Sequence, residues 1–75
     1  MTARYIVLLE EDQWMIRYKD RHYGPYPGRH TAFRLAVDMA HIVSLSGGDS
    51  EVLVQWDEDS FDLEWKSGRD PYPPV

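Results

Sequence analysis

The sequence contains no cysteine. It can therefore form neither a disulfide scaffold nor a thiolate zinc site, and it has no cysteine nucleophile. A small chain without such cross-links is typical of a reducing compartment, which favours the cytoplasm. The longest unbroken apolar run, Tyr5 to Leu9, is far too short for a secretory signal or a membrane span. We therefore expect a cytoplasmic protein without a membrane segment.

Basic residues are scarce in the second half of the chain. Residues 1–46 carry six Lys or Arg against five acids, and residues 47–75 carry two against eight, which together give the net charge of −5. Binding of nucleic acid depends on neutralising phosphates, so the acidic half argues against such a partner. It does not exclude a local basic patch.

Patterns for catalysis and metal binding are also missing. The three histidines, His22, His30 and His41, lack zinc-site spacing, and the acidic run at 57–64 lacks the glycine and final glutamate of an EF-hand loop. The sequence offers no nucleophile beside a base and no glycine-rich phosphate loop. We expect a protein that is not an enzyme and that uses neither a cofactor nor a metal.

The residues that are present indicate one folded domain. Hydrophobic residues make up 43% of the chain and charged residues 28%, as in globular proteins. Apolar residues recur with the helical period over 31–46, with Thr31 as the expected N-cap and Gly47-Gly48 as the expected stop. The other apolar runs predict strands at 5–9, 14–18, 21–23, 51–56 and 61–65.

This order of elements, β-β-(β)-α-β-β, predicts an α+β fold. The economical arrangement is a two-layer sandwich with the one helix packed on a mainly antiparallel sheet. We expect a single domain over 1–66, followed by a Pro-rich tail over 67–75 that is extended or mobile because its prolines cannot continue a sheet. Alternation places Phe61 and Leu63 inward. It likewise places three tryptophans on the helix side of the sheet, Trp14, Trp56 and Trp65.

The first strand is apolar on both faces, although one helix can cover only one face. Either its odd-numbered or its even-numbered residues lack a helix to pack on, and exposed apolar sheet surface usually marks an interaction site. Alternatively, the Pro-rich tail or the Tyr23–Tyr26 loop folds over that face. The leading hypothesis is a non-catalytic interaction module that binds a protein partner or a second copy through an open sheet face or edge. The candidate surface comprises Tyr5, Val7, Leu9, Arg17, Tyr23 and Tyr26.

A second hypothesis concerns the stretch from Tyr18 to Arg29, which combines cations with aromatic rings. Single-stranded nucleic-acid binders use such a combination. No recognition motif accompanies it, and a solvated hairpin whose tyrosines anchor a loop explains the same residues.

Four short motifs together resemble a family of small bacterial domains of unknown function. They are Trp14-x-Ile16-Arg17, the helix pattern Thr31-x-x-x-x-Ala36-x-x-x-Ala40, Val52-x-Val54-Gln55 and the closing segment Gly68 to Pro74, GRDPYPP. The resemblance implies bacterial origin and a small α+β fold, and it brings no catalytic residues. The chain departs from the family at 57–59, where Asp-Glu-Asp replaces the usual Asp-Gly turn.

Overall fold

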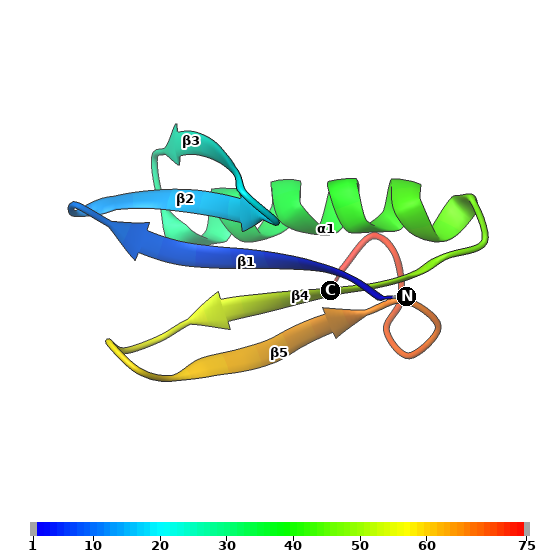
Figure 1. Cartoon of the computed structure of the whole chain (residues 1–75). Coiled ribbons are helices and arrows are strands. Elements are labelled where there is room, and N and C mark those ends of the chain that lie inside the picture. The colour runs from blue at the N-terminus through cyan, green and yellow to red at the C-terminus, as the bar shows by residue number, and fades with distance from the viewer. Residues whose placement is uncertain (1, 75) are drawn as a thin grey trace.

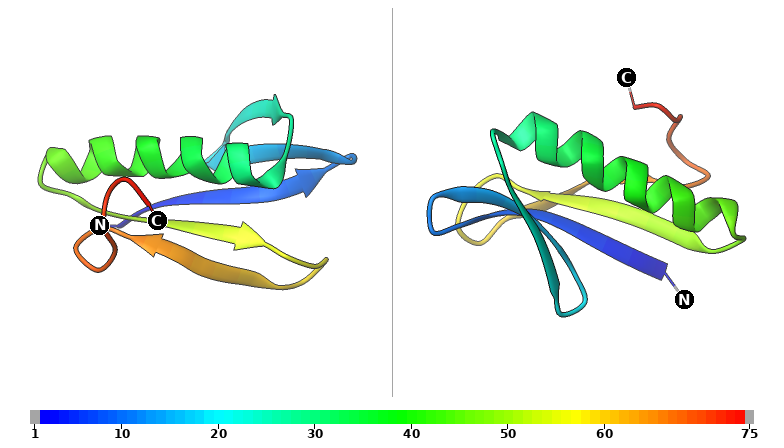
Figure 2. Two further views of the ribbon diagram at one scale, coloured as in Figure 1. Left: turned by 180° about the vertical axis from the view of Figure 1, so that it is seen from behind. Right: turned by 90° about the horizontal axis from the view of Figure 1, so that it is seen from above.

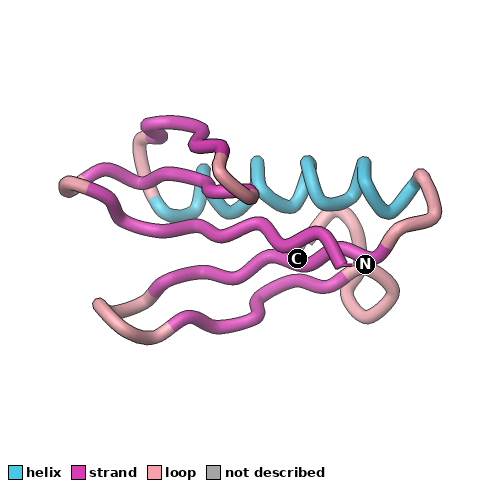
Figure 3. The backbone as a smooth tube through the Cα atoms, in the orientation of Figure 1, coloured by secondary structure: helices cyan, strands magenta, loops and turns pink. Residues whose placement is uncertain are grey.

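The computed structural model describes residues 2–74, which form an α-helix packed on a five-stranded sheet (Figure 1). The backbone tube in Figure 3 shows the same elements with short connecting turns. The α+β class and the predicted order of elements are confirmed. The strands are β1 (Thr2–Glu10), β2 (Gln13–Tyr18), β3 (Arg21–Tyr26), β4 (Asp49–Gln55) and β5 (Phe61–Lys66), and the helix is α1 (Arg29–Leu45).

The strands lie in the order β3-β2-β1-β4-β5. Three of the neighbouring pairs are antiparallel, and the central pair β1–β4 is parallel, with Tyr5 opposite Val52. The chain runs from β1 through a hairpin and α1 before it returns as β4, which is the long crossover that a parallel pair requires. The sheet is therefore mainly antiparallel with a parallel centre.

The helix begins two residues before the expected N-cap. Gly28 is the N-cap in an extended conformation, and no side chain within residues 2–74 caps the first turn. Pro27 before it already ends the preceding strand, so the helix starts as soon as the chain leaves that segment. At the other end, Gly47 has a φ of +90° and supplies the predicted left-handed residue.

The core lies between α1 and one face of the sheet. Small side chains on α1 allow the helix to approach the sheet closely, and β-branched residues of the three central strands fill the space beneath it. The views in Figure 2 show α1 along one face only. The core consists of Ala32, Ala36, Val37 and Ala40 from the helix, with Tyr5, Val7, Ile16, Val52, Val54 and Trp65 from the sheet.

Strand β5 differs from its predicted orientation. Its pairing with β4 shifts between Val52 and Leu53, so that Trp65 lies opposite Val52 but Leu63 lies opposite Leu53. One extra residue at such a bulge reverses the alternation. Trp65 is therefore in the core as predicted, whereas the inward placement of Phe61 and Leu63 was wrong: both lie on the face away from α1.

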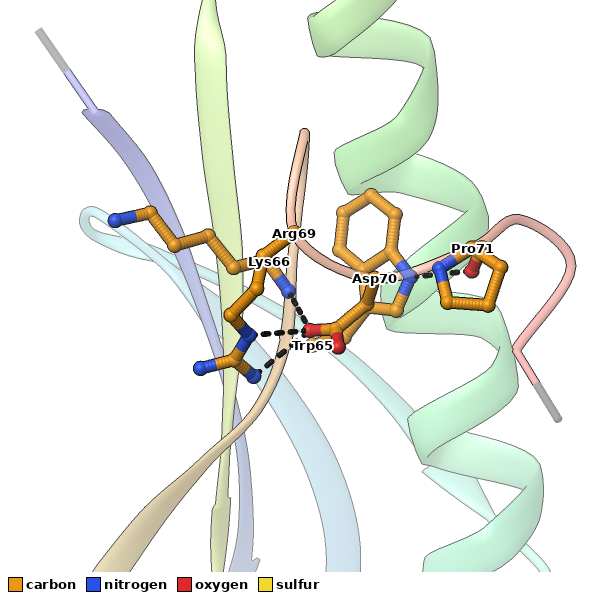
Figure 4. Close-up of polar contacts among 5 residues, drawn as sticks. All are labelled: Trp65, Lys66, Arg69, Asp70 and Pro71. Atoms are coloured by element: carbon orange, nitrogen blue, oxygen red, sulfur yellow. Dashed lines mark hydrogen bonds and ion pairs between the residues drawn. The ribbon is translucent and has the colours of Figure 1, made fainter.

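The Pro-rich tail folds back against the helix and does not extend away from the sheet. The Trp65 indole Nε1–H donates to the Pro71 carbonyl over 2.9 Å, and the Asp70 carboxylate accepts from the Lys66 backbone N–H over 2.8 Å (Figure 4). The Tyr72 ring then stacks on His41 of α1 at a centroid distance of 3.7 Å. The described part of the tail, residues 67–74, therefore does not cover the other face of the sheet, so the alternative in which the tail folds over that face is wrong for these residues.

The β1–β2 hairpin turn uses two residues that are poorly suited to it. Glu11 and Asp12 have φ values of +50° and +64°, the pattern of a type I′ turn, which favours Asn-Gly. We expect Glu11→Asn with Asp12→Gly to raise the free energy of unfolding by about 1 kcal/mol, because it relieves left-handed strain. Chemical denaturation measures this; an unchanged or lower midpoint would contradict it.

Two tyrosines make the fold sensitive to alkaline pH. Burial raises the pKa of Tyr5 above its usual 10, with help from neighbouring Tyr18 and Tyr23. The hydrogen bond that the Tyr72 hydroxyl donates to Asp38 raises the pKa of Tyr72. The folded state then keeps protons that the unfolded chain releases above about pH 10, so stability falls as the pH rises through that range.

Denaturation of the wild type and Tyr5→Phe between pH 8 and 11 tests this dependence. The variant should lose less stability than the wild type over that range, because it removes a group that must ionise on unfolding. Parallel curves would show that Tyr5 contributes nothing to the alkaline sensitivity.

Candidate interaction surfaces

The face of the sheet opposite α1 is apolar at its centre. Because Tyr5 and Val7 point into the core, Ile6 and Leu8 of β1 point to this open face, and the same alternation applies to the neighbouring strands. Leu8 is shielded by its neighbours, and Phe61 and Leu63 are exposed. We name the apolar group the open face: Ile6, Leu8, Met15, Leu53, Phe61 and Leu63.

Charges of both signs surround the open face. The Arg4 guanidinium Nε lies 2.6 Å from Glu51 Oε2, and His22 Nδ1 lies 3.0 Å from Glu10 Oε1. Register places Arg17 beside Ile6 on β2, on this same side of the sheet. The rim is thus nearly balanced in charge, in contrast to the acidic chain as a whole. An apolar centre with a polar rim is the usual anatomy of a protein interface.

The predicted candidate surface is only partly exposed. Tyr5 and Val7 lie in the core beneath α1, so their assignment to an interaction surface was wrong. The apolar run at 5–9 gave no indication of which set of residues the helix covers. Arg17 lies at the rim of the open face, on the side of β2 that the helix does not cover.

Leu9, Tyr23 and Tyr26 lie elsewhere. Tyr23 and Tyr26 are half-buried and pack against the core from edge strand β3, so they neither cover the open face nor belong to it. Leu9 is exposed near the end of β1. The six residues that were predicted to form one surface therefore lie in several separate parts of the structure.

The outer side of α1 carries a second, narrower apolar strip. Leu35, Ile42 and Leu45 are exposed, and their spacing of seven and three residues places them on one side of the helix. This helix strip is the alternative to the open face as a contact surface.

A basic hollow of about 740 Å³ lies at the end of the sheet where β1 begins. Its lining includes three cationic residues, Arg4, Arg17 and Lys19, together with His22 and one acid, Asp20. Tyr18 also lines it, with its ring stacked on Tyr5 at 4.4 Å.

An acidic hollow of about 380 Å³ lies at the opposite end, between the β1–β2 and β4–β5 hairpins. Trp14 and Trp56 line it together with Leu9. Trp56 was predicted on the helix side of the sheet, but it is 61% exposed and does not pack beneath α1, whereas Trp14 is half-buried against the core. Both hairpin turns lie beyond the N-terminal end of α1, where the helix no longer covers the sheet (Figure 1).

No helix in the described range 2–74 has the length and apolar character needed to cross a membrane. The resemblance to a bacterial family stays a prediction. Comparisons with protein-family models, with curated proteins and with solved structures each found no match for this chain.

Proposed function

We propose that the chain is a non-catalytic interaction module whose open face binds a second copy of itself. The observation that carries the proposal is the apolar face of the sheet that α1 does not cover, with half-buried Leu53 on interior strand β4 and exposed Phe61 and Leu63 on edge strand β5. Contiguous exposed apolar patches on folded proteins usually mark sites of interaction with a partner. Location in a bacterial cytoplasm belongs to the same proposal.

Charge favours a second copy as the occupant. The whole chain has a net charge of −5, so two copies repel each other over most of their surfaces. The open face is the exception, because its rim pairs Arg4 with Glu51 and adds Arg17. Two copies that meet through this face bring opposite charges within reach and keep the acidic hairpin ends out of the contact.

Width favours the open face over the helix strip. Five strands spaced about 4.8 Å apart span about 19 Å, whereas a helix presents a ridge about 10 Å across. A stable interface needs about 800 Å² from each partner, which a broad sheet face supplies more readily than one strip of a helix.

Sedimentation of two leucine variants tests the proposal. Leu63 on the open face is 37% exposed and Leu45 on the helix strip is 72% exposed, so both tolerate substitution. Leu63→Asn should weaken dimerisation at least about tenfold, since a symmetric contact loses two buried leucines. Leu45→Asn, the matched control, should dimerise as the wild type does.

Two results would contradict the proposal. The first is a wild-type chain that sediments as a monomer up to millimolar concentration. The second is the reverse ranking, in which Leu45→Asn weakens the dimer and Leu63→Asn does not, which would assign the contact to the helix strip.

The basic hollow supports the second candidate function, binding of single-stranded nucleic acid in the Tyr18–Arg29 region. Its cations, Arg17 and Lys19 among them, are suited to phosphates. Tyr18 is already stacked on Tyr5, which limits its use as a platform for bases. Titration of labelled oligonucleotides at low salt tests this function, and the absence of binding below about 100 µM would reject it.

A further inference from the structure

The acidic hollow exists because two hairpins diverge. The last parallel pair of β1 and β4 is Val7 with Val54, and beyond it the backbone N–H of Leu9 donates to the Gln55 side chain over 2.8 Å. The Gln55 amide in turn donates to the Glu58 carbonyl over 3.4 Å. One side chain thus bridges the gap where the backbone ladder ends, and the hollow lies around it.

Apolar groups line this hollow without being covered. Trp56 and Leu9 are both exposed, and Trp14 lies opposite Leu9 in the β1–β2 ladder. Alternation places Leu9 and Trp14 on the same face of the sheet as the core, and the two hairpin turns beside the hollow lie beyond the N-terminal end of α1 (Figure 1). An indole that is exposed within a hollow has a free face available for a ligand.

Acidic residues from both hairpin turns border the hollow. Glu11 and Asp12 come from the β1–β2 turn, and Asp57 and Glu58 come from the segment after β4. No Lys, Arg or His occurs among the described residues that line it. The lining of the hollow therefore combines acidic residues with two indoles.

We propose that this hollow binds an arginine side chain of a basic peptide segment. A guanidinium is planar, stacks on an indole face and donates to carboxylates in two directions at once. The lysine ammonium is a compact, strongly hydrated charge and uses the indole faces less well. The hollow combines the two features that a guanidinium requires, an exposed indole at Trp56 and acidic residues such as Asp57 and Glu58 in its lining. One Asp57 oxygen, Oδ1, already accepts from the Asp59 backbone N–H over 3.0 Å.

This binding is independent of the contact proposed for the open face. The residues that line the hollow do not include any of the apolar residues of the open face. Occupation of one surface therefore leaves the other available, and the two proposals succeed or fail separately.

Nuclear magnetic resonance titration with an amidated peptide of alternating arginine and glycine tests the proposal. The indole N–H signals of Trp14 and Trp56 should shift. The indole N–H signal of Trp65, which is buried and hydrogen-bonded to the Pro71 carbonyl, should stay in place. A matched peptide with lysine in place of arginine should bind several-fold more weakly. A matched peptide with glutamate in place of arginine should not bind. Equal binding of the lysine peptide would overturn the choice of arginine.

Variants separate a built site from general charge attraction. Trp56→Ala should weaken binding about three- to thirty-fold through loss of the cation–π contact. Asp57→Asn with Glu58→Gln should weaken binding and lower its salt dependence. The matched control on β5, Asp62→Asn with Glu64→Gln, removes the same charge outside the hollow and should have a smaller effect.

Equal losses from the two acidic pairs, or wild-type binding by Trp56→Ala, would overturn the proposal. Leu63→Asn serves as the independence control. It should bind the arginine peptide as the wild type does even where it no longer dimerises, so failure of one proposal is distinguishable from failure of the other.

Discussion

Trp65→Ala should remove about 3–5 kcal/mol from the free energy of unfolding, since a large buried ring is replaced by a cavity. Trp65 is 2% exposed, lies opposite Val52 in the core and donates its indole N–H to the tail at Pro71. A domain of 75 residues has a total stability of only about 4–11 kcal/mol. We therefore expect a variant that is largely or wholly unfolded near physiological temperature, as measured by thermal and urea denaturation.

Trp56→Ala is the matched control for this effect. Trp56 is 61% exposed, so its replacement should change the unfolding midpoint little. Acrylamide should quench the Trp56 indole readily and the Trp65 indole poorly. Equal stability losses in the two variants would contradict the placement of these rings.

Ile16→Ala should cost about 2–5 kcal/mol, the second large effect. Ile16 is fully buried beneath α1, whereas Ile42 on the helix strip is 65% exposed. Ile42→Ala removes the same atoms from an exposed site and should shift stability by no more than about 0.5 kcal/mol. Ile6→Ala, on the open face, should fall between them.

The isoleucine series is measured by urea denaturation at several protein concentrations. If Ile6 lies in a dimer contact, the stability that Ile6→Ala loses relative to the wild type should grow with protein concentration, because dimerisation stabilises the wild type by mass action. Losses at Ile16 and Ile42 of equal size would contradict the assignment of the core to the helix side of the sheet.

The element order could be predicted from the sequence because local periodicity and turn residues both indicate it. The helical period and Gly47 predicted both ends of α1 to within two residues. The apolar runs predicted the position of each strand in the chain. The β4–β5 bulge could not be predicted in this way. Alternation across Phe61–Trp65 is unbroken in the sequence, and only pairing with β4 shows that one residue is extra.

The candidate surfaces were harder to predict because they depend on how far the helix extends. Trp56 continues the alternation of Val52 and Val54, and the period-two pattern places it on the core face. Periodicity contains no information about how much of the sheet a helix covers, and the N-terminal end of α1 does not reach the β1–β2 and β4–β5 turns (Figure 1). The tail was mispredicted for a related reason: prolines prevent strand pairing, but they do not prevent Tyr72 from stacking on His41.

The basic hollow and the acidic hollow also depend on tertiary structure. Parallel pairing of β1 with β4 brings Asp12 and Asp57, which are far apart in the sequence, to the same end of the sheet. The sequence shows that the acids at 57–64 lack the spacing of an EF-hand loop. It does not show that they lie beside a second acidic turn and two indoles.

Methyl chemical shifts measured over a range of protein concentrations test the open-face proposal most directly. From micromolar to millimolar protein, the methyl signals of Ile6, Leu53 and Leu63 should move together along one binding curve. Those of Ile42 and Leu45 on the helix strip should stay constant. Signals that move only on the helix strip, or shifts that do not change on any of these residues, would contradict the proposal that two copies meet through the open face.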